Sequence, residues 1–328
     1  MQRLSPAFVA ALLAAAVLLA PVLASTGSWA APIAVEAKPV ALNAQDPAQT
    51  TVGKLKYRGG LALTSPDGNF GGLSDLRVSR DGARLLTIGD KGIRFSATLI
   101  YGADGNLVGV KDGDLGQLTG LDGQALRGRN EVDAEAMAPG AEGEMIVAFE
   151  RDHRIWRYFP NNPVPEPIPP PDELKHAPRN GGIEAMTLLL DGKLLLIAED
   201  FGKGGRNVAW VSSRDGWSVL TYAVDGGYQP TGAATLPNGD VLTVERRFNL
   251  REGAGGRIKH IPRESIQPGG HMEGTTIAEL QSPLTVDNFE GIEARKDEAS
   301  GRTLIYLISD DNHNPLQRTL LLMFELIE

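Results

Sequence analysis

One short pattern occurs five times along the chain and constrains its fold more than any other feature. Each copy is a run rich in Val, Leu, Ile and Thr, then a tight Gly-containing turn, then a second such run. Two such runs flanking a turn indicate a β-hairpin. Helical periodicity is nearly absent. The copies cover residues 73–90, 135–150, 184–199, 232–245 and 293–310.

The spacing of the copies predicts the architecture. Their turn glycines are 61, 49, 47 and 62 residues apart and are Gly82, Gly143, Gly192, Gly239 and Gly301. A unit of this length holds about four strands, the size of a propeller blade. We therefore expect an all-β fold, a single β-propeller of five four-stranded blades. Residues 54–63 would complete the fifth blade, so that N- and C-terminal strands pair and close the ring.

Two other architectures fit parts of the pattern. Six blades would result if the two longer spacings hide a degenerate blade. A β-sandwich is the other all-β alternative, but it needs no fixed internal repeat. The Pro-rich stretch 160–171 resembles a linker, yet the repeat continues on both sides of it. We therefore predict a surface loop inside one domain.

The N-terminal residues have the pattern of an export signal. Arg3 precedes an apolar run over residues 7–24, and small residues at Ser28 and Ala30 fit a cleavage site. An uncleaved membrane anchor is the alternative, since the run approaches the length that spans a bilayer. We predict a signal peptide over residues 1–30, a loose leader over 31–52 and the propeller over 53–328. We expect a periplasmic or secreted protein without stable membrane insertion after cleavage.

Charge and composition exclude several classes of function. The chain has 32 Lys and Arg against 41 Asp and Glu, a net charge of −9, which disfavours nucleic-acid binding because that needs a basic surface. The absence of Cys excludes disulfides, Cys-ligated zinc, iron–sulfur clusters and a thiol nucleophile. The sequence has no G-x-S-x-G elbow, no H-E-x-x-H pair and no P-loop. No flat apolar face stands out, so we expect a monomer.

Acidic residues recur at matching places in the repeat. Residues equidistant from a hairpin turn lie side by side, and this rule pairs Glu135 with Glu150 and Glu184 with Glu199. The first strand of a blade lines the channel, so its start and the end of the second strand share one face. Flanked by Asp133, the acids expected on that face are Asp75, Asp90, Glu135, Glu150, Glu184, Glu199, Glu245, Glu290, Glu293 and Asp310.

So many neighbouring carboxylates require compensation, because like charges oppose one another's ionisation. One solution is a purely structural salt-bridge network with the interleaved Arg and Lys side chains. The other is a hard cation such as Ca²⁺, which takes about six to eight oxygen ligands. The sequence leaves both solutions open.

The same regions carry a resemblance to a known family. The segments that carry it are Gly71–Asp75, Asp133–Met137, Gly182–Met186, Gln229–Gly232, Asn288–Glu293 and Ser309–Leu320. They resemble the phytase-like β-propeller proteins of bacteria, described as having the "esterase-like activity of phytase", over about residues 55–327. The resemblance implies hydrolysis of phosphate or carboxylic esters. β-Propeller phytases hold several Ca²⁺ ions at an acidic channel mouth.

We therefore predict a Ca²⁺-dependent hydrolase of a small-molecule phosphate ester or, second, a carboxylic ester. The predicted metal ligands are Asp75, Glu135, Glu184, Glu290, Glu293 and Asp310. The cations expected to neutralise the ester oxyanion are Arg151, Arg246 and Lys91, and the candidate general bases are Glu150, Glu199 and His313. The alternative is a non-catalytic binding propeller of the cell envelope, in which the acidic ring is a structural brace.

Overall fold

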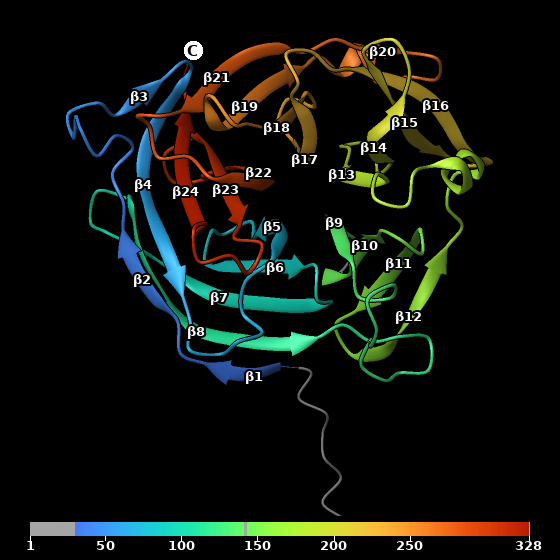
Figure 1. The fold of residues 1–328 in the computed structure, drawn as a ribbon, viewed down its shortest axis with the longest axis horizontal. Coiled ribbons are helices and arrows are strands. Elements are labelled where there is room, and N and C mark those ends of the chain that lie inside the picture. Colours follow the sequence, from blue (N-terminus) through green and yellow to red (C-terminus); the bar gives the residue numbers. More distant parts are fainter. Residues whose placement is uncertain (1–29, 141–142, 328) are drawn as a thin grey trace, which may run out of the picture.

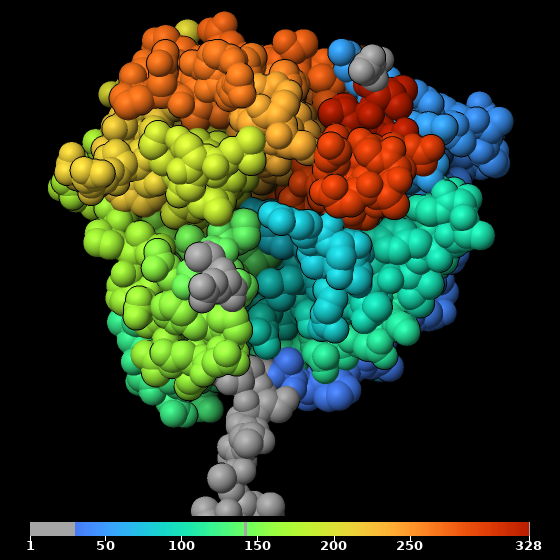
Figure 2. Space-filling model, turned by 180° about the vertical axis from the view of Figure 1, so that it is seen from behind, coloured from blue at the N-terminus to red at the C-terminus, as the bar shows by residue number. Residues whose placement is uncertain are grey.

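The computed structural model describes residues 30–140 and 143–327, so the predicted signal peptide lies outside the described residues except for Ala30. Five β-sheets surround a central axis, which confirms the predicted five-bladed propeller (Figure 1). Figure 2 shows the opposite side of the molecule, on which the turns of the inner hairpins lie. The short 3₁₀ helices η2 (Asp172–His176) and η3 (Arg263–Ser265) lie between strands. No helix among the described residues is long and apolar enough to cross a membrane.

Each blade runs from an innermost strand at the channel to outer strands at the rim. Blade 1 comprises β5 (Leu73–Val78), β6 (Arg84–Gly89), β7 (Ile93–Tyr101) and β8 (Leu107–Gln117). Blade 2 comprises β9 (Ala134–Pro139), β10 (Met145–Phe149), β11 (Arg154–Phe159) and β12 (Asn162–Ile168). Blade 3 comprises β13 (Ile183–Leu188), β14 (Leu194–Gly202), β15 (Arg206–Ser213) and β16 (Gly216–Ala223), with β20 (His271–Met272) added in parallel.

The last two blades complete the ring. Blade 4 comprises β17 (Gln229–Thr235), β18 (Val241–Asn249), β19 (Gly253–Ile261) and β21 (Thr275–Gln281). Blade 5 comprises β22 (Asn288–Lys296), β23 (Thr303–Asp310), β24 (Thr319–Leu326) and β4 (Leu55–Thr64). Strands β24 and β4 pair with Leu321 opposite Leu61. The predicted closure by N- and C-terminal strands is therefore correct.

Two local predictions differ from the structure. Residues 31–52 are not a loose leader throughout, because β1 (Ala30–Ile33) extends blade 1 through β8, and β2 (Glu36–Pro39) and β3 (Thr51–Val52) pair with β4. Such edge strands are held by backbone hydrogen bonds and need no apolar periodicity. The Pro-rich stretch is likewise not only a loop, since β12 lies in it at a sheet edge, where proline is tolerated.

The hydrophobic core lies between neighbouring blades. Phe289, Leu322 and Phe324, for example, are fully buried in one cluster between blades 4 and 5. The innermost strand of a blade is covered on both faces. β5, for example, is buried at every residue. A strand buried on both faces reads as a continuous apolar run, as the repeats do.

Candidate metal centre

A β-bulge at the same place in every blade positions the acidic side chains. In each inner hairpin the register shifts by one residue near the start of the first strand, which leaves that residue without a partner on the second strand. Bulges re-aim side chains and break a ladder locally. The unpaired residues are Ser74, Glu135, Glu184, Thr231 and Glu290.

The second strands end at the same level of the channel. Each terminal residue lies opposite the residue two positions before the bulge, as Glu150 N–H donates to the carbonyl of Asp133 at 2.9 Å. Four blades place an acid there, and blade 4 places an arginine: Asp90, Glu150, Glu199, Arg246 and Asp310. We call the resulting group the acidic mouth; its members are Asp90, Asp133, Glu135, Glu150, Glu184, Glu199, Glu290 and Asp310.

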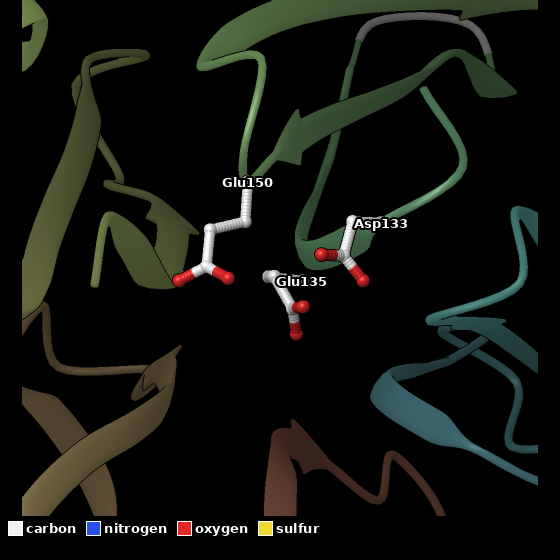
Figure 3. A group of neighbouring side chains, drawn as sticks. All are labelled: Asp133, Glu135 and Glu150. Atoms are coloured by element: carbon white, nitrogen blue, oxygen red, sulfur yellow. The ribbon is translucent and has the colours of Figure 1, made fainter. Parts of the chain in front are cut away.

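Three of these carboxylates are close enough to share an ion (Figure 3). One oxygen each of Asp133, Glu135 and Glu150 lies within 4.8 Å of the other two. The three come from one blade, from the start of β9 and the end of β10. Sequence reasoning named Asp133 only as a flanking acid. The bulge moves it beside Glu150, a position that the equidistance rule had given to Glu135.

Burial and neighbouring negative charges favour the protonated forms of the carboxyl groups in the acidic mouth. Burial, followed by the charges of neighbouring acids, raises the pKa of Glu135 and of Glu184 well above the ordinary range. Burial also raises the pKa of Glu290 to about 8 and that of Asp310 to about 7. Burial raises the pKa of Glu150 too, although a hydrogen bond with Glu184 opposes the shift. The group retains protons that a bound cation would displace.

Arg246 inserts positive charge between two blades. Its Nε lies 2.9 Å from Glu290 Oε1, and its Nη2 lies 3.3 Å from Glu199 Oε2. The attraction of Glu290 is the main reason that the pKa of Arg246 is raised. The side chain remains 35% exposed. Arg246 is therefore a fixed cation at the surface of the mouth.

The other predicted cations and the predicted histidine lie at the edge of the acidic mouth. Arg151 pairs with Asp133 and has a left-handed backbone, φ 61°, directly after Glu150. His313 Nε2 is 3.6 Å from Asp90 Oδ1. Burial raises the pKa of Asp90, and the charges of His313 and Lys91 oppose that shift. Lys91 itself is exposed.

Two predicted metal ligands lie elsewhere. Asp75 is fully buried and accepts hydrogen bonds from the N–H groups of Leu76 and Met137, both at 2.7 Å, while Arg77 Nη1 lies 3.2 Å from it. Glu293 lies 3.8 Å from Arg77 Nε and lines a cavity at the other end of the channel. The structure thus brings together Glu135, Glu184, Glu290 and Asp310, and it does not bring Asp75 and Glu293 to them.

Glu245 also leaves the predicted acidic face. The bulge in blade 4 places it opposite Pro230 instead of Gly232. It is fully buried, with Arg257 Nε at 2.5 Å and Lys259 Nζ at 3.2 Å. Its role is a structural ion pair inside the blades.

A model of one protein family matches the chain. The family is "Phytase-like: Esterase-like activity of phytase", and the match spans residues 68–313, well over half of the 328 residues. No curated protein matches the chain significantly.

Several solved structures have similar folds at low identity. A protein of unknown function from Dyadobacter fermentans is 14% identical, over 91% of this chain and 94% of that one, with a TM-score of 0.44. A putative gluconolactonase is 11% identical, over 92% and 95%, with a TM-score of 0.44. The virginiamycin B lyase of Staphylococcus aureus, solved with quinupristin, is 12% identical, over 88% and 99%, with a TM-score of 0.43.

Proposed function

The chain belongs to the phytase-like family, and from this premise we propose that it is an exported, Ca²⁺-dependent hydrolase of small phosphate or carboxylic esters. The acidic mouth is the proposed active site. Phosphate esters are the preferred substrate class, and carboxylic esters are the second. The observation that carries the proposal is the excess of carboxylates over cations at that mouth.

The donor set of the mouth fits a hard divalent cation. All eight acidic side chains offer oxygen, the ligand atom that Ca²⁺ takes in sets of about six to eight. Asp133, Glu135 and Glu150 would hold the ion first, since their oxygens already converge. Glu184 hydrogen-bonds to Glu150 and would complete the set from the next blade. A bound Ca²⁺ supplies positive charge that polarises an ester oxygen and makes water easier to deprotonate.

The protein's own cations would bind and orient the ester. A guanidinium has five N–H donors in a planar fork. Nε and Nη2 of Arg246 face Glu290 and Glu199, whereas Nη1 has no partner among the described residues. Nη1 would therefore donate to a phosphoryl or acyl oxygen. Arg151, paired with Asp133, would add positive charge beside the metal ligands.

His313 is the preferred proton acceptor. Glu199 is paired with Arg246, and Glu150 belongs to the proposed metal ligands. His313 pairs with neither Arg151 nor Arg246, and its Nε2, 3.6 Å from Asp90 Oδ1, would take a proton from water.

A non-catalytic binding propeller is the second candidate. The observation that favours it is that Arg246 and Arg151 already pair with Glu199, Glu290 and Asp133. Such pairing would suit an acidic ring that serves only as a brace.

Thermal unfolding with parallel turnover assays tests the proposal. The protein is melted in EDTA and in excess Ca²⁺, and hydrolysis of p-nitrophenyl phosphate and p-nitrophenyl acetate is followed in the same samples. A ligand specific for the folded state stabilises it by about 2.7 kcal/mol at a hundredfold excess over Kd. Glu135→Gln should lose both the Ca²⁺ shift and the turnover. Glu298→Gln, an exposed matched control on the hairpin-turn face, should keep both. A Ca²⁺ shift without turnover would favour the binding propeller. The absence of both the shift and the turnover would reject the metal site.

A further inference from the structure

The side chain of Arg77 lies across the channel between the acidic mouth and the opposite end. Arg77, on β5, reaches across the axis and donates to the carbonyls of three other inner strands: Met137 on β9, Met186 on β13 at 2.8 Å and Ile292 on β22 at 3.3 Å. Its side chain is only 10% exposed. The channel is therefore closed at this level, and its far end is a compartment of its own.

That compartment is a cavity of about 1200 Å³. It opens on the face that carries the hairpin turns, and in Figure 2 the segments that line it surround a hollow near the centre of the view. The volume is larger than the roughly 300–1,000 Å³ typical of small-molecule sites. Its walls come from all five blades and are mainly apolar, including Val78, Leu85, Leu86, Met137, Met145 and Leu236.

Three cations that form no ion pair with a described residue lie at the rim of this cavity. Arg80, Arg84 and Lys296 are all exposed. Arg84 donates to Ser96 Oγ at 3.2 Å, whereas no described residue accepts a hydrogen bond from the side chain of Arg80 or Lys296.

The acids at the rim do not cancel these charges. Glu144 is paired with Arg157 at 3.7 Å, and Glu293 faces Arg77 at the floor. Glu298 is the one exposed, unpaired acid among the described lining residues. Among the described lining residues, cations therefore outnumber acids.

We infer that this cavity binds an amphiphilic carboxylate, with its hydrocarbon chain against the apolar walls and its head group at Arg80, Arg84 and Lys296. Burial of hydrocarbon supplies the affinity, because the free energy scales with the apolar area removed from water. The rim cations select the charged head group. A compact polyanion would leave the apolar walls wet, and a neutral hydrocarbon would leave the cations unused. This inference goes beyond the proposed hydrolase and does not depend on it.

Fluorescence titration of the full chain tests the inference. The probe is 11-(dansylamino)undecanoic acid, and the competitors are laurate and its neutral counterpart dodecanol, below their aggregation limits. All titrations contain EDTA, so that failure of the metal-dependent activity does not affect the result. We expect laurate to displace the probe about tenfold more effectively than dodecanol. Removing rim cations should weaken the binding of laurate but not that of dodecanol, since each exposed ion pair contributes up to about fivefold in affinity.

Variants at the rim locate the site. Leu190 lines the cavity and is 67% exposed, so it tolerates polar replacement. Leu190→Glu and Leu190→Gln have the same shape, but only the former repels a carboxylate. Laurate should bind Leu190→Glu several-fold more weakly than Leu190→Gln, and dodecanol should bind both equally. Arg80→Ala/Lys296→Ala should weaken laurate binding, unlike Arg214→Ala at the exposed β15–β16 turn.

Three outcomes would overturn the inference. The first is no binding of the probe. The second is equal competition by laurate and dodecanol, which would mean that the head group is not recognised. The third is laurate binding that none of the rim variants changes, which would place the site elsewhere.

Discussion

Replacing Arg77 by methionine removes the cation that closes the channel while filling a similar space. The guanidinium lies 3.2 Å from Asp75, which is fully buried, and it donates to carbonyls on β9, β13 and β22. Methionine is flexible and fills irregular gaps, so the main loss is electrostatic. Removing one partner of a buried ion pair costs about 3–5 kcal/mol of unfolding free energy.

The size of this loss depends on pH in a predictable direction. Burial raises the pKa of Asp75 from 3.8 to about 7, against the lowering effect of Arg77. A carboxyl whose folded pKa is raised contributes stability fully below its unfolded pKa, about 3.8, and loses it as the pH rises through about 7. Without Arg77 the folded pKa of Asp75 rises further, so Arg77→Met continues to lose stability at pH values where the wild type has levelled off.

Urea unfolding at about pH 5 and about pH 8.5 in EDTA separates the stability lost with the hydrogen bonds to carbonyls from the stability lost with the Asp75 ion pair. At the lower pH, Asp75 is protonated in both proteins, so the loss reflects the bonds to carbonyls and should be about 1–3 kcal/mol. At the higher pH it should reach about 3–5 kcal/mol. Asp75→Asn in the Arg77→Met background should recover the difference. The reasoning would be refuted if Arg77→Met lost the same unfolding free energy at the two pH values and the coupling energy between Asp75 and Arg77 were below about 0.5 kcal/mol.

Three further predictions concern the other charged groups. Glu245→Gln should cost about 3–5 kcal/mol in chemical unfolding, because it leaves buried cations unpaired; Asp225→Asn, at the exposed partner of the same cations, should cost less than about 1 kcal/mol. In EDTA the melting temperature should fall as pH rises from about 5 to about 8, because the folded pKa values of Glu290, about 8, and Asp310, about 7, are raised; a flat profile would contradict those shifts. Arg246→Ala should raise KM for p-nitrophenyl phosphate about tenfold, the worth of one charge-assisted hydrogen bond, and should tighten Ca²⁺ binding in calorimetry; an unchanged KM would remove Arg246 from the substrate site.

The repeat predicted the blades, but the turn-centred pairing rule misplaced several acids. Counting outward from a turn assumes an unbroken ladder, and each inner hairpin contains a bulge. A signal for the bulge was present: Ser74, Glu135, Glu184 and Thr231 all stand eight residues before a turn glycine. Aligning the copies on that position groups Glu135 with Glu184 and separates both from Asp75, which is the arrangement that the structure has.

Other features left no pattern in the sequence. β1 and β2 are edge strands of four residues each, and their partly or fully exposed side chains give no periodic signal. The apolar cavity behind Arg77 depends on residues from all five blades meeting at one end of the channel. Pairings between such distant segments follow from ring closure and not from any local run of residues.

The quasi-symmetric ring carries an asymmetric charge, and this asymmetry orients the proposed chemistry. Blades 2, 3 and 5 have an acid both at the bulge of the first strand and at the end of the second strand. Blade 1 has an acid only at the end of its second strand, Asp90, and blade 4 has none at either place. Blade 4 instead supplies Thr231 and Arg246, whose guanidinium reaches the acids of both neighbouring blades. A cation is therefore favoured near the Asp133, Glu135 and Glu150 side of the mouth, and an anionic substrate near Arg246. An ester held between those two sides would have its phosphoryl or acyl group directed toward the metal, a polarity that a fully symmetric acidic ring would not impose.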